Sequence, residues 1–211
     1  MEEPLRIDVV TDVVCPWCFI GVERLEHVLE RFDHPVELVH HPFLLQPATP
    51  PEGVDIPAML RAKYGTDPRA LFERAEAAAR ESGIDLDLSK QRYSYPSLRA
   101  HTLIRHAGER GTQRALAREF FRANFQDARN VNDPDTLAEI GGRHGFTAEE
   151  VHQLVSDEGE LARTRADAEG AARRGIRGVP FFVFQNRAAV SGAQPEDVFK
   201  GLLERALAGD L

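Results

Sequence analysis

The two cysteines of the chain, Cys15 and Cys18, are separated only by Pro16 and Trp17. A helix that begins at Pro16 places the first thiol at its N-terminus, where free backbone N–H groups and the helix dipole stabilise a thiolate. The second thiol lies one turn further along the helix and can reach the first. We therefore predict thiol-disulfide exchange, in which Cys15 attacks a substrate sulfur and Cys18 resolves the mixed disulfide. Trp17 would supply an apolar surface beside the reactive sulfur.

Three other uses of this cysteine pair are less consistent with the sequence. A structural disulfide across two residues would close a very small loop and add little stability. A metal site would need two further ligands, but His101 and His106 are five residues apart, which does not align them on one helical face. Adjacent histidines of a strand, such as His40 and His41, point in opposite directions. Inert core cysteines are disfavoured by the strand before the pair and the helix after it. We expect no metal.

The composition excludes several classes of function. Acidic residues (34) outnumber basic residues (26), which gives a formal net charge of −8, whereas proteins that bind nucleic acid usually have a basic excess. The apolar runs are far shorter than the roughly 20 residues of a membrane span. The sequence begins Met1-Glu2-Glu3-Pro4, which is acidic where a signal peptide would be basic and then apolar. We therefore expect no nucleic-acid partner, no membrane association and a cytoplasmic location.

The elements that position the cysteines come from both ends of the chain. Residues 5–14 are rich in valine and predict a buried strand, and the apolar spacing from residue 16 onward predicts a helix. Residues 36–45 predict a second strand that is bent at Pro42. Near the other end, residues 179–185 and 188–191 predict a β-hairpin, and residues 195–208 a closing helix. The predicted order is β-α-β, then β-β-α.

The segment between these two ends is predicted to be helical. Residues 47–57 are rich in proline and indicate an extended connection, and the next 120 or so residues show helical spacing and capping signals. Thr147 and Glu150 fit a capping box. We predict one α/β domain formed by residues 1–46 and 176–211, with a helical subdomain of residues 47–175 inserted into it. The helical segments are predicted at 58–64, 68–82, 96–108, 112–126, 134–144 and 147–175.

Motifs from several parts of the chain form one recognisable pattern. They are Asp12–Gly21 (D-V-V-C-P-W-C-F-I-G), Pro42–Leu45 (P-F-L-L), Ala100–Arg105 (A-H-T-L-I-R), Phe120–Phe125 (F-F-R-A-N-F), Gly175–Val183 (G-I-R-G-V-P-F-F-V) and Val190–Gln194 (V-S-G-A-Q). This pattern resembles the DsbA family of thioredoxin-fold oxidoreductases and is most similar to its FrnE-like branch, whose members are often cytoplasmic. The resemblance extends over nearly the whole chain.

The resemblance implies an α/β thioredoxin fold (β-α-β … β-β-α) with a large all-helical insertion. It also implies a redox-active Cys15–Cys18 pair and a cis peptide bond between Val179 and Pro180 beside it. An extended substrate segment would then pair with the backbone of Val179. The residues alone leave Pro180 open between a cis proline and a trans proline that starts a strand. Some relatives carry a second cysteine pair, which this chain does not have.

Other polar residues near the predicted site have two interpretations each. Asp12 is a candidate proton acceptor for Cys18, although we favour a structural role as a helix cap or a solvent-facing residue. One of His40 and His41 could approach the cysteines, but a packed and hydrogen-bonded histidine is the expected arrangement. His101 could line a cleft or pack between the two parts of the chain, and we favour packing.

Three hypotheses for function follow. The first is a thiol-disulfide oxidoreductase that exchanges with protein or small-molecule disulfides, needs no cofactor beyond its cysteines and could use glutathione as reductant. The second is a glutathione-dependent enzyme of the type of 2-hydroxychromene-2-carboxylate isomerase and kappa-class glutathione transferase, a neighbouring branch that normally has serine in place of the first cysteine. The third is a non-catalytic, chaperone-like binding protein. Cysteine at both 15 and 18 favours the first.

Overall fold

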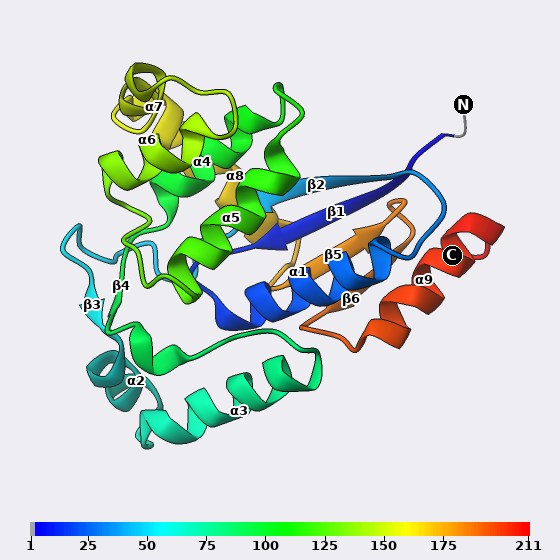
Figure 1. The fold of residues 1–211 in the computed structure, drawn as a ribbon, viewed down its shortest axis with the longest axis horizontal. Helices are drawn as coiled ribbons and strands as arrows, with labels where there is room; N and C mark the ends of the chain where they lie inside the picture. The colour runs from blue at the N-terminus through cyan, green and yellow to red at the C-terminus, as the bar shows by residue number, and fades with distance from the viewer. Residues whose placement is uncertain (1–2) are drawn as a thin grey trace.

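A mixed four-stranded sheet lies at the centre of the fold (Figure 1), and the computed structural model describes residues 3–211. Its strand order is β2-β1-β5-β6. Strand β1 (Leu5–Thr11) pairs in parallel with β2 (Val36–Pro42) and antiparallel with β5 (Phe181–Phe184). Strand β5 also pairs antiparallel with β6 (Ala188–Ser191). The two ends of the chain therefore build one sheet, as the sequence predicts.

Helices cover both faces of this sheet. Helices α1 (Pro16–Leu29) and α9 (Glu196–Ala208) lie on the face seen in front in Figure 1. On the opposite face, Val10 of β1 and Phe181 of β5 pack with Ala171 of α8 (Glu158–Arg173). Because side chains alternate along a strand, β1 can contact both helical layers at once. This is the thioredoxin arrangement that the resemblance implies.

The segment between β2 and β5 forms the helical insertion. The local sequence explains where its helices begin, since Asp55, Asp67, Asp133 and Asp157 each accept a hydrogen bond from a first-turn backbone N–H, and Thr147 and Glu150 form the predicted capping box. Before α8 the insertion contains α2 (Ile56–Tyr64), α3 (Pro68–Glu81), α4 (Leu98–Ala107), α5 (Gln113–Phe125), α6 (Pro134–Gly142) and α7 (Ala148–Leu154).

Some details of the predicted elements are wrong. The insertion is not all-helical, because β3 (Val54–Asp55) pairs with β4 (Tyr93–Ser94). It also contains a short 3-10 helix at Leu88–Lys90 that was not predicted. Strands of two residues are too short to give a periodic signal. The predicted helix 147–175 is divided into α7 and α8, because Asp157 caps a new helix. The first two strands end at Thr11 and Pro42, three residues earlier than predicted.

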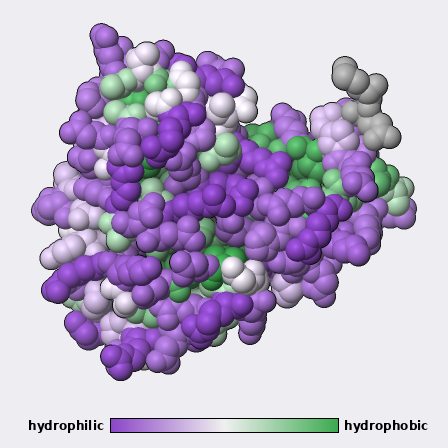
Figure 2. Space-filling model, viewed as in Figure 1, coloured by the Kyte–Doolittle hydropathy of each residue, from purple (hydrophilic) through white to green (hydrophobic). Residues whose placement is uncertain are grey.

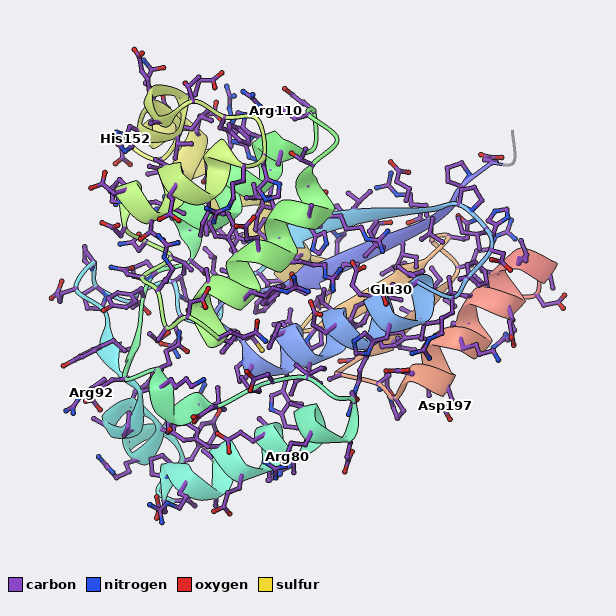
Figure 3. The ribbon with its side chains drawn as sticks, viewed as in Figure 1. Glu30, Arg80, Arg92, Arg110, His152 and Asp197 are labelled. Carbon is purple, nitrogen blue, oxygen red and sulfur yellow. The ribbon has the colours of Figure 1, made fainter. Side chains whose placement is uncertain are left out.

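The insertion packs directly against α1. The ring of Phe19 stacks with the rings of Phe121 and Phe125 of α5, at centroid distances of 6.1 and 5.5 Å. Most buried apolar side chains of both parts belong to a single hydrophobic cluster. Charged residues cover the outside, and Figure 3 labels exposed examples from both parts of the fold. None of the helices within residues 3–211 has the length and apolar character needed to cross a membrane.

Candidate active site

The cysteine pair lies at the N-terminus of α1. Cys15 is the N-cap residue of this helix, and Pro16 occupies its first turn, where the missing N–H group has no intrahelical acceptor to lose. The backbone N–H of Cys15 donates to the Asp12 carbonyl over 3.0 Å, which forms a tight turn between β1 and α1. No side chain caps the helix. The positive end of the helix dipole therefore acts on the Cys15 sulfur, as the sequence predicts.

The two thiols have different surroundings. Both are free and both are buried, but Cys15 keeps 5% exposure and lines a cavity, whereas Cys18 has none and lies one turn further along α1. Burial, followed by the hydrogen bond with Cys15 and the charge of Cys15, raises the pKa of the Cys18 thiol well above its ordinary value. A substrate can thus reach the first sulfur but not the second. This difference suits an attacking Cys15 and a resolving Cys18.

Val179 and Pro180 lie beside the cysteines although they are more than 160 positions away in the chain. The peptide bond between them is cis. The Cys15 thiol lies 4.0 Å from the Val179 carbonyl oxygen, and Val179 also lines the cavity. Pro180 packs closely on Gly21 of α1. A Cβ atom at that glycine would lie only 2.9 Å from the Pro180 Cγ, so a larger residue does not fit there. The structure therefore brings together the two motifs that the sequence analysis paired.

Asp12 is buried beneath the cysteine pair and does not face solvent. Its carboxylate accepts hydrogen bonds from the backbone N–H groups of Val14, over 3.3 Å, and Leu45, over 2.8 Å. The Nε2 atom of His101, also buried, lies 3.4 Å from Asp12 Oδ1. Asp12 thus fastens the turn before Cys15 to the segment after β2. Its negative charge also raises the pKa of Cys18, while a role in proton transfer stays a prediction.

His40 and His41 point to opposite faces of β2. His41 Nε2 lies 2.7 Å from Asp8 Oδ1. His40 is packed as expected, but the expectation that it is hydrogen-bonded is wrong, because neither ring nitrogen has a partner among residues 3–211. Burial, with smaller contributions from the charges of His41, His101 and Arg114, lowers the pKa of His40 to about 3. His40 is therefore neutral over the whole physiological range.

A cavity of about 390 Å³ opens beside Cys15, between the start of α1 and the helices of the insertion. Pro16 and Trp17 line this cavity, as the sequence indicates for the surroundings of Cys15, but nothing in the sequence indicated that α2 and α3 contribute to it. Their apolar spacing was visible, but spacing cannot distinguish a cavity wall from a core-facing helix. The remaining side chains along the wall are those of Val14, Leu45, Gln46, Ile56, Met59, Leu60, Lys63, Tyr64, Leu71, Phe72, Arg74, Ala75, Leu88, Gln91, Ser94 and Phe125.

No group of three or more histidine, cysteine or acidic side chains within the described part of the chain is placed to hold a metal ion. The groups that the structure brings together at this site are the two thiols and the polar groups around them. Cys15 is 5% exposed and lines a largely apolar cavity at the helix N-terminus, Cys18 is fully buried one turn further along, and the cavity also adjoins the Val179 backbone. This arrangement can bind a sulfur-containing molecule and exchange its sulfur.

Comparisons with known proteins agree with this geometry. The DSBA-like thioredoxin domain family matches residues 6–204. A crystal structure of a probable DsbA oxidoreductase from Streptomyces coelicolor is similar, with a TM-score of 0.86 and 36% identity over 97% of this chain and 90% of that one. The cytosolic disulfide reductase DsbM from Pseudomonas aeruginosa, solved with GSH, has a TM-score of 0.69 and 18% identity over 97% and 100%. YwbO of Bacillus subtilis is 24% identical over 206 residues, or 93% of this chain and 94% of that protein.

Proposed function

Since the chain belongs to the DSBA-like thioredoxin domain family, we propose that it is a thiol-disulfide oxidoreductase whose reaction is carried by Cys15 and Cys18. The observation that supports this most directly is the unequal environment of the two thiols. Cys15 lines a cavity at a helix N-terminus, and Cys18 is fully buried with a raised pKa. A pair built only for structure would not need one sulfur open to a ligand.

The exchange runs in two steps. The Cys15 thiolate attacks one sulfur of a substrate disulfide, a bond forms between them, and the first substrate thiol leaves and takes up a proton. The Cys18 thiolate then attacks the Cys15 sulfur, the second substrate thiol leaves, and the protein retains a Cys15–Cys18 disulfide. Two electrons pass from the protein to the substrate in this direction, and the reverse sequence oxidises a dithiol.

Val179 supplies the docking surface in this proposal. Its carbonyl oxygen lies 4.0 Å from the Cys15 sulfur, so an extended substrate that pairs with this backbone would bring its own sulfur close to Cys15. Pro180 presents neither an N–H group nor a charge to the cysteines. Pro16 and Trp17 complete the rim of the cavity. Asp12 interacts with Cys18 and is proposed as the group that accepts its proton.

We also propose that the reaction runs toward reduction in a cytoplasmic setting. A reducing cytosol holds such a pair as a dithiol, and glutathione is the proposed source of electrons that regenerates it. The relative solved with GSH supports testing this thiol first. Titration of the Cys15–Cys18 couple against glutathione redox buffers measures the reduction potential and decides the direction.

Reduction of insulin by dithiothreitol tests the proposed function. The parent protein should accelerate precipitation of the insulin B chain, and Cys15→Ser should abolish the acceleration. Cys18→Ser should accumulate a mixed disulfide that is visible on a non-reducing gel, because the resolving thiol is missing. A parent protein that reduces neither insulin nor small disulfides would overturn the proposal. Tight glutathione binding, measured by calorimetry and retained in Cys18→Ser, would instead favour a glutathione-dependent isomerase or transferase.

A further inference from the structure

We propose that the cavity beside Cys15 binds the organic part of a small disulfide substrate that combines an apolar, ring-sized group with a carboxylate. This inference rests on the proposed exchange function and specifies its substrate class. Four features of the structure support it: the helix that forms one wall of the cavity, the distribution of exposed apolar side chains, the charge of the cavity lining, and the size of the cavity.

Helix α2 is the first feature. Ile56, Met59 and Leu60 recur at helical spacing along one side of this helix, and all three line the cavity. An amphipathic helix normally buries such a stripe in the core. No residue of α2 is buried, however, and none belongs to the hydrophobic clusters of residues 3–211. The apolar side of α2 therefore faces the cavity instead of contributing to the core.

Exposed apolar side chains also gather at this place. The large hydrophobic residues that are exposed in the described chain are Leu45 (40%), Tyr64 (52%), Tyr93 (41%) and Leu207 (53%). Leu45 and Tyr64, two of these four, line the cavity. Figure 2 shows hydrophobic side chains at the surface between the regions of α1 and α3. Clustered exposure of this kind marks a binding site more often than scattered single residues do.

The charge of the cavity lining selects an anion. The charged residues in the lining are Lys63 and Arg74, and no aspartate or glutamate is among them. This contrasts with the whole chain, whose formal net charge is −8. Both cations are exposed, so they remain hydrated and attract a carboxylate at the mouth without the cost of a buried charge. The lining thus matches a ligand with an apolar body and a negative end.

The size of the cavity indicates a small molecule. Its volume of about 390 Å³ lies within the usual range for small-molecule sites, roughly 300–1,000 Å³. Helix α2 forms one wall, and Leu71, Phe72 and Ala75 of α3 form another. The sulfur of Cys15 also lines the cavity. A ring with a short substituent can occupy this space while its sulfur meets Cys15. A polypeptide would place only one side chain there, and that alternative is an outcome of the test.

The reaction with such a substrate, R–S–S–R, balances without a further component. The Cys15 thiolate displaces one R–S⁻, which is protonated by solvent, and the Cys18 thiolate then displaces the second from Cys15. The substrate gains two electrons and becomes two R–SH molecules, while the protein becomes the Cys15–Cys18 disulfide. Dithiothreitol returns the protein to the dithiol in the assay.

Three symmetrical disulfides test the proposal. They are the disulfides of 4-(mercaptomethyl)benzoate, 4-(mercaptomethyl)benzamide and 3-mercaptopropionate, and each kcat/KM is divided by the rate of direct reduction by dithiothreitol. The benzoate should exceed each of the others about tenfold, because it alone combines the ring with the charge. Equal normalised values, or a higher value for insulin, would overturn this inference but leave the exchange function standing. Failure with every disulfide would overturn both.

Variants locate the selectivity. Met59→Ser combined with Leu60→Ser should lower the advantage of the benzoate over 3-mercaptopropionate about tenfold. Lys63→Gln combined with Arg74→Gln should remove most of the preference for benzoate over benzamide, and added salt should weaken that preference in the parent protein. Leu207→Ser is the control, since it removes an exposed leucine that lies outside the cavity, whereas Met59 and Leu60 are half-buried and line it. The inference is wrong if the cavity variants behave like this control.

Discussion

Replacement of Gly21 by alanine tests the contact that holds the Pro180 loop against α1. A Cβ atom at this position would lie 2.9 Å from Pro180 Cγ, 3.3 Å from the Ala193 Cα and 3.3 Å from Phe182 Cζ. Carbon atoms in favourable contact are about 3.5–4.0 Å apart. The added methyl group therefore cannot be accommodated unless the proline ring or the backbone at Ala193 moves away from the helix.

The magnitude follows from two opposing effects. Alanine is favoured over glycine in a helix interior by about 1 kcal/mol, whereas overpacking a filled site costs about 1–3 kcal/mol. Gly21→Ala should therefore lower the free energy of unfolding by up to about 2 kcal/mol. Gly201 of α9 is the matched control, because a Cβ atom there meets nothing within 4 Å. Gly201→Ala should raise the free energy of unfolding by up to about 1 kcal/mol.

Urea unfolding followed by circular dichroism measures both variants, and insulin reduction measures their activity. Gly21→Ala should be about 1–3 kcal/mol less stable than Gly201→Ala. It should also exchange disulfides more slowly, since the loop that it displaces carries the Val179 carbonyl 4.0 Å from the Cys15 sulfur. If Gly21→Ala is stabilised as much as Gly201→Ala and retains the parental rate, close packing of Pro180 on α1 is required neither for stability nor for disulfide exchange.

Three further predictions concern buried groups. At pH 8, iodoacetamide should alkylate Cys15 in Cys18→Ser but leave Cys18 in Cys15→Ser unmodified until urea is added, because Cys15 can be reached from the cavity, whereas Cys18 is fully buried and burial raises its pKa. The pKa of His40 is lowered to about 3, so the unfolded chain binds a proton first as the pH falls below about 6.5. Between the unfolded pKa and the folded pKa of about 3, the free energy of unfolding should therefore fall by up to about 1.4 kcal/mol for each pH unit of acidification. His40→Gln should make this dependence on pH less steep. Arg118→Met should cost about 2–3 kcal/mol in urea unfolding, because the buried Glu23 carboxylate loses its two hydrogen bonds of 2.9 and 3.0 Å.

Exposed residues provide the controls for these measurements. His152→Gln removes an exposed histidine and is the variant with which the acid slope of His40→Gln is compared. Glu204 pairs with Lys200 on the surface of α9, and Glu204→Gln should cost less than about 0.5 kcal/mol. A parental acid slope in His40→Gln, or equal losses in Arg118→Met and Glu204→Gln, would contradict the energetic roles given to these buried groups. Rapid alkylation of Cys18 in the folded protein would contradict its assignment as the shielded thiol.

The parts of the fold that local sequence determines were predictable. The position of α1, the hairpin of β5 and β6, and the capping box at Thr147 all follow from spacing and turn chemistry within a few residues. The pairing of β1 with β5 is not local, and it could be anticipated only because the motifs at both ends resemble one family. The spacing of the two cysteines and the helix signals after them were enough to predict a thiol at a helix N-terminus, where the structure has Cys15.

The missed features depend on contacts between distant residues. Glu23 and Glu26 gave no signal in the sequence, because charged residues of a helix are almost always exposed. Their carboxylates accept hydrogen bonds from Arg118 and Arg114, which lie 95 and 88 positions further along the chain and offset the cost of burial. His40 was expected to be hydrogen-bonded because most buried polar groups are. Only the packed structure shows that its ring nitrogens have no partner within residues 3–211.

The insertion is fastened to the same helix that carries the cysteines. On one side of α1, Phe19 stacks with the aromatic rings of α5, and Glu23 binds Arg118. On another side, the Arg24 guanidinium donates to the Ala78 carbonyl and to the Ser82 hydroxyl at the end of α3, over 2.8 and 2.7 Å. These contacts fix α3, and with it one wall of the cavity, relative to the reactive sulfur. A dithiol at a helix N-terminus is enough for the proposed exchange of sulfur, so in this proposal the insertion decides which disulfide reaches it.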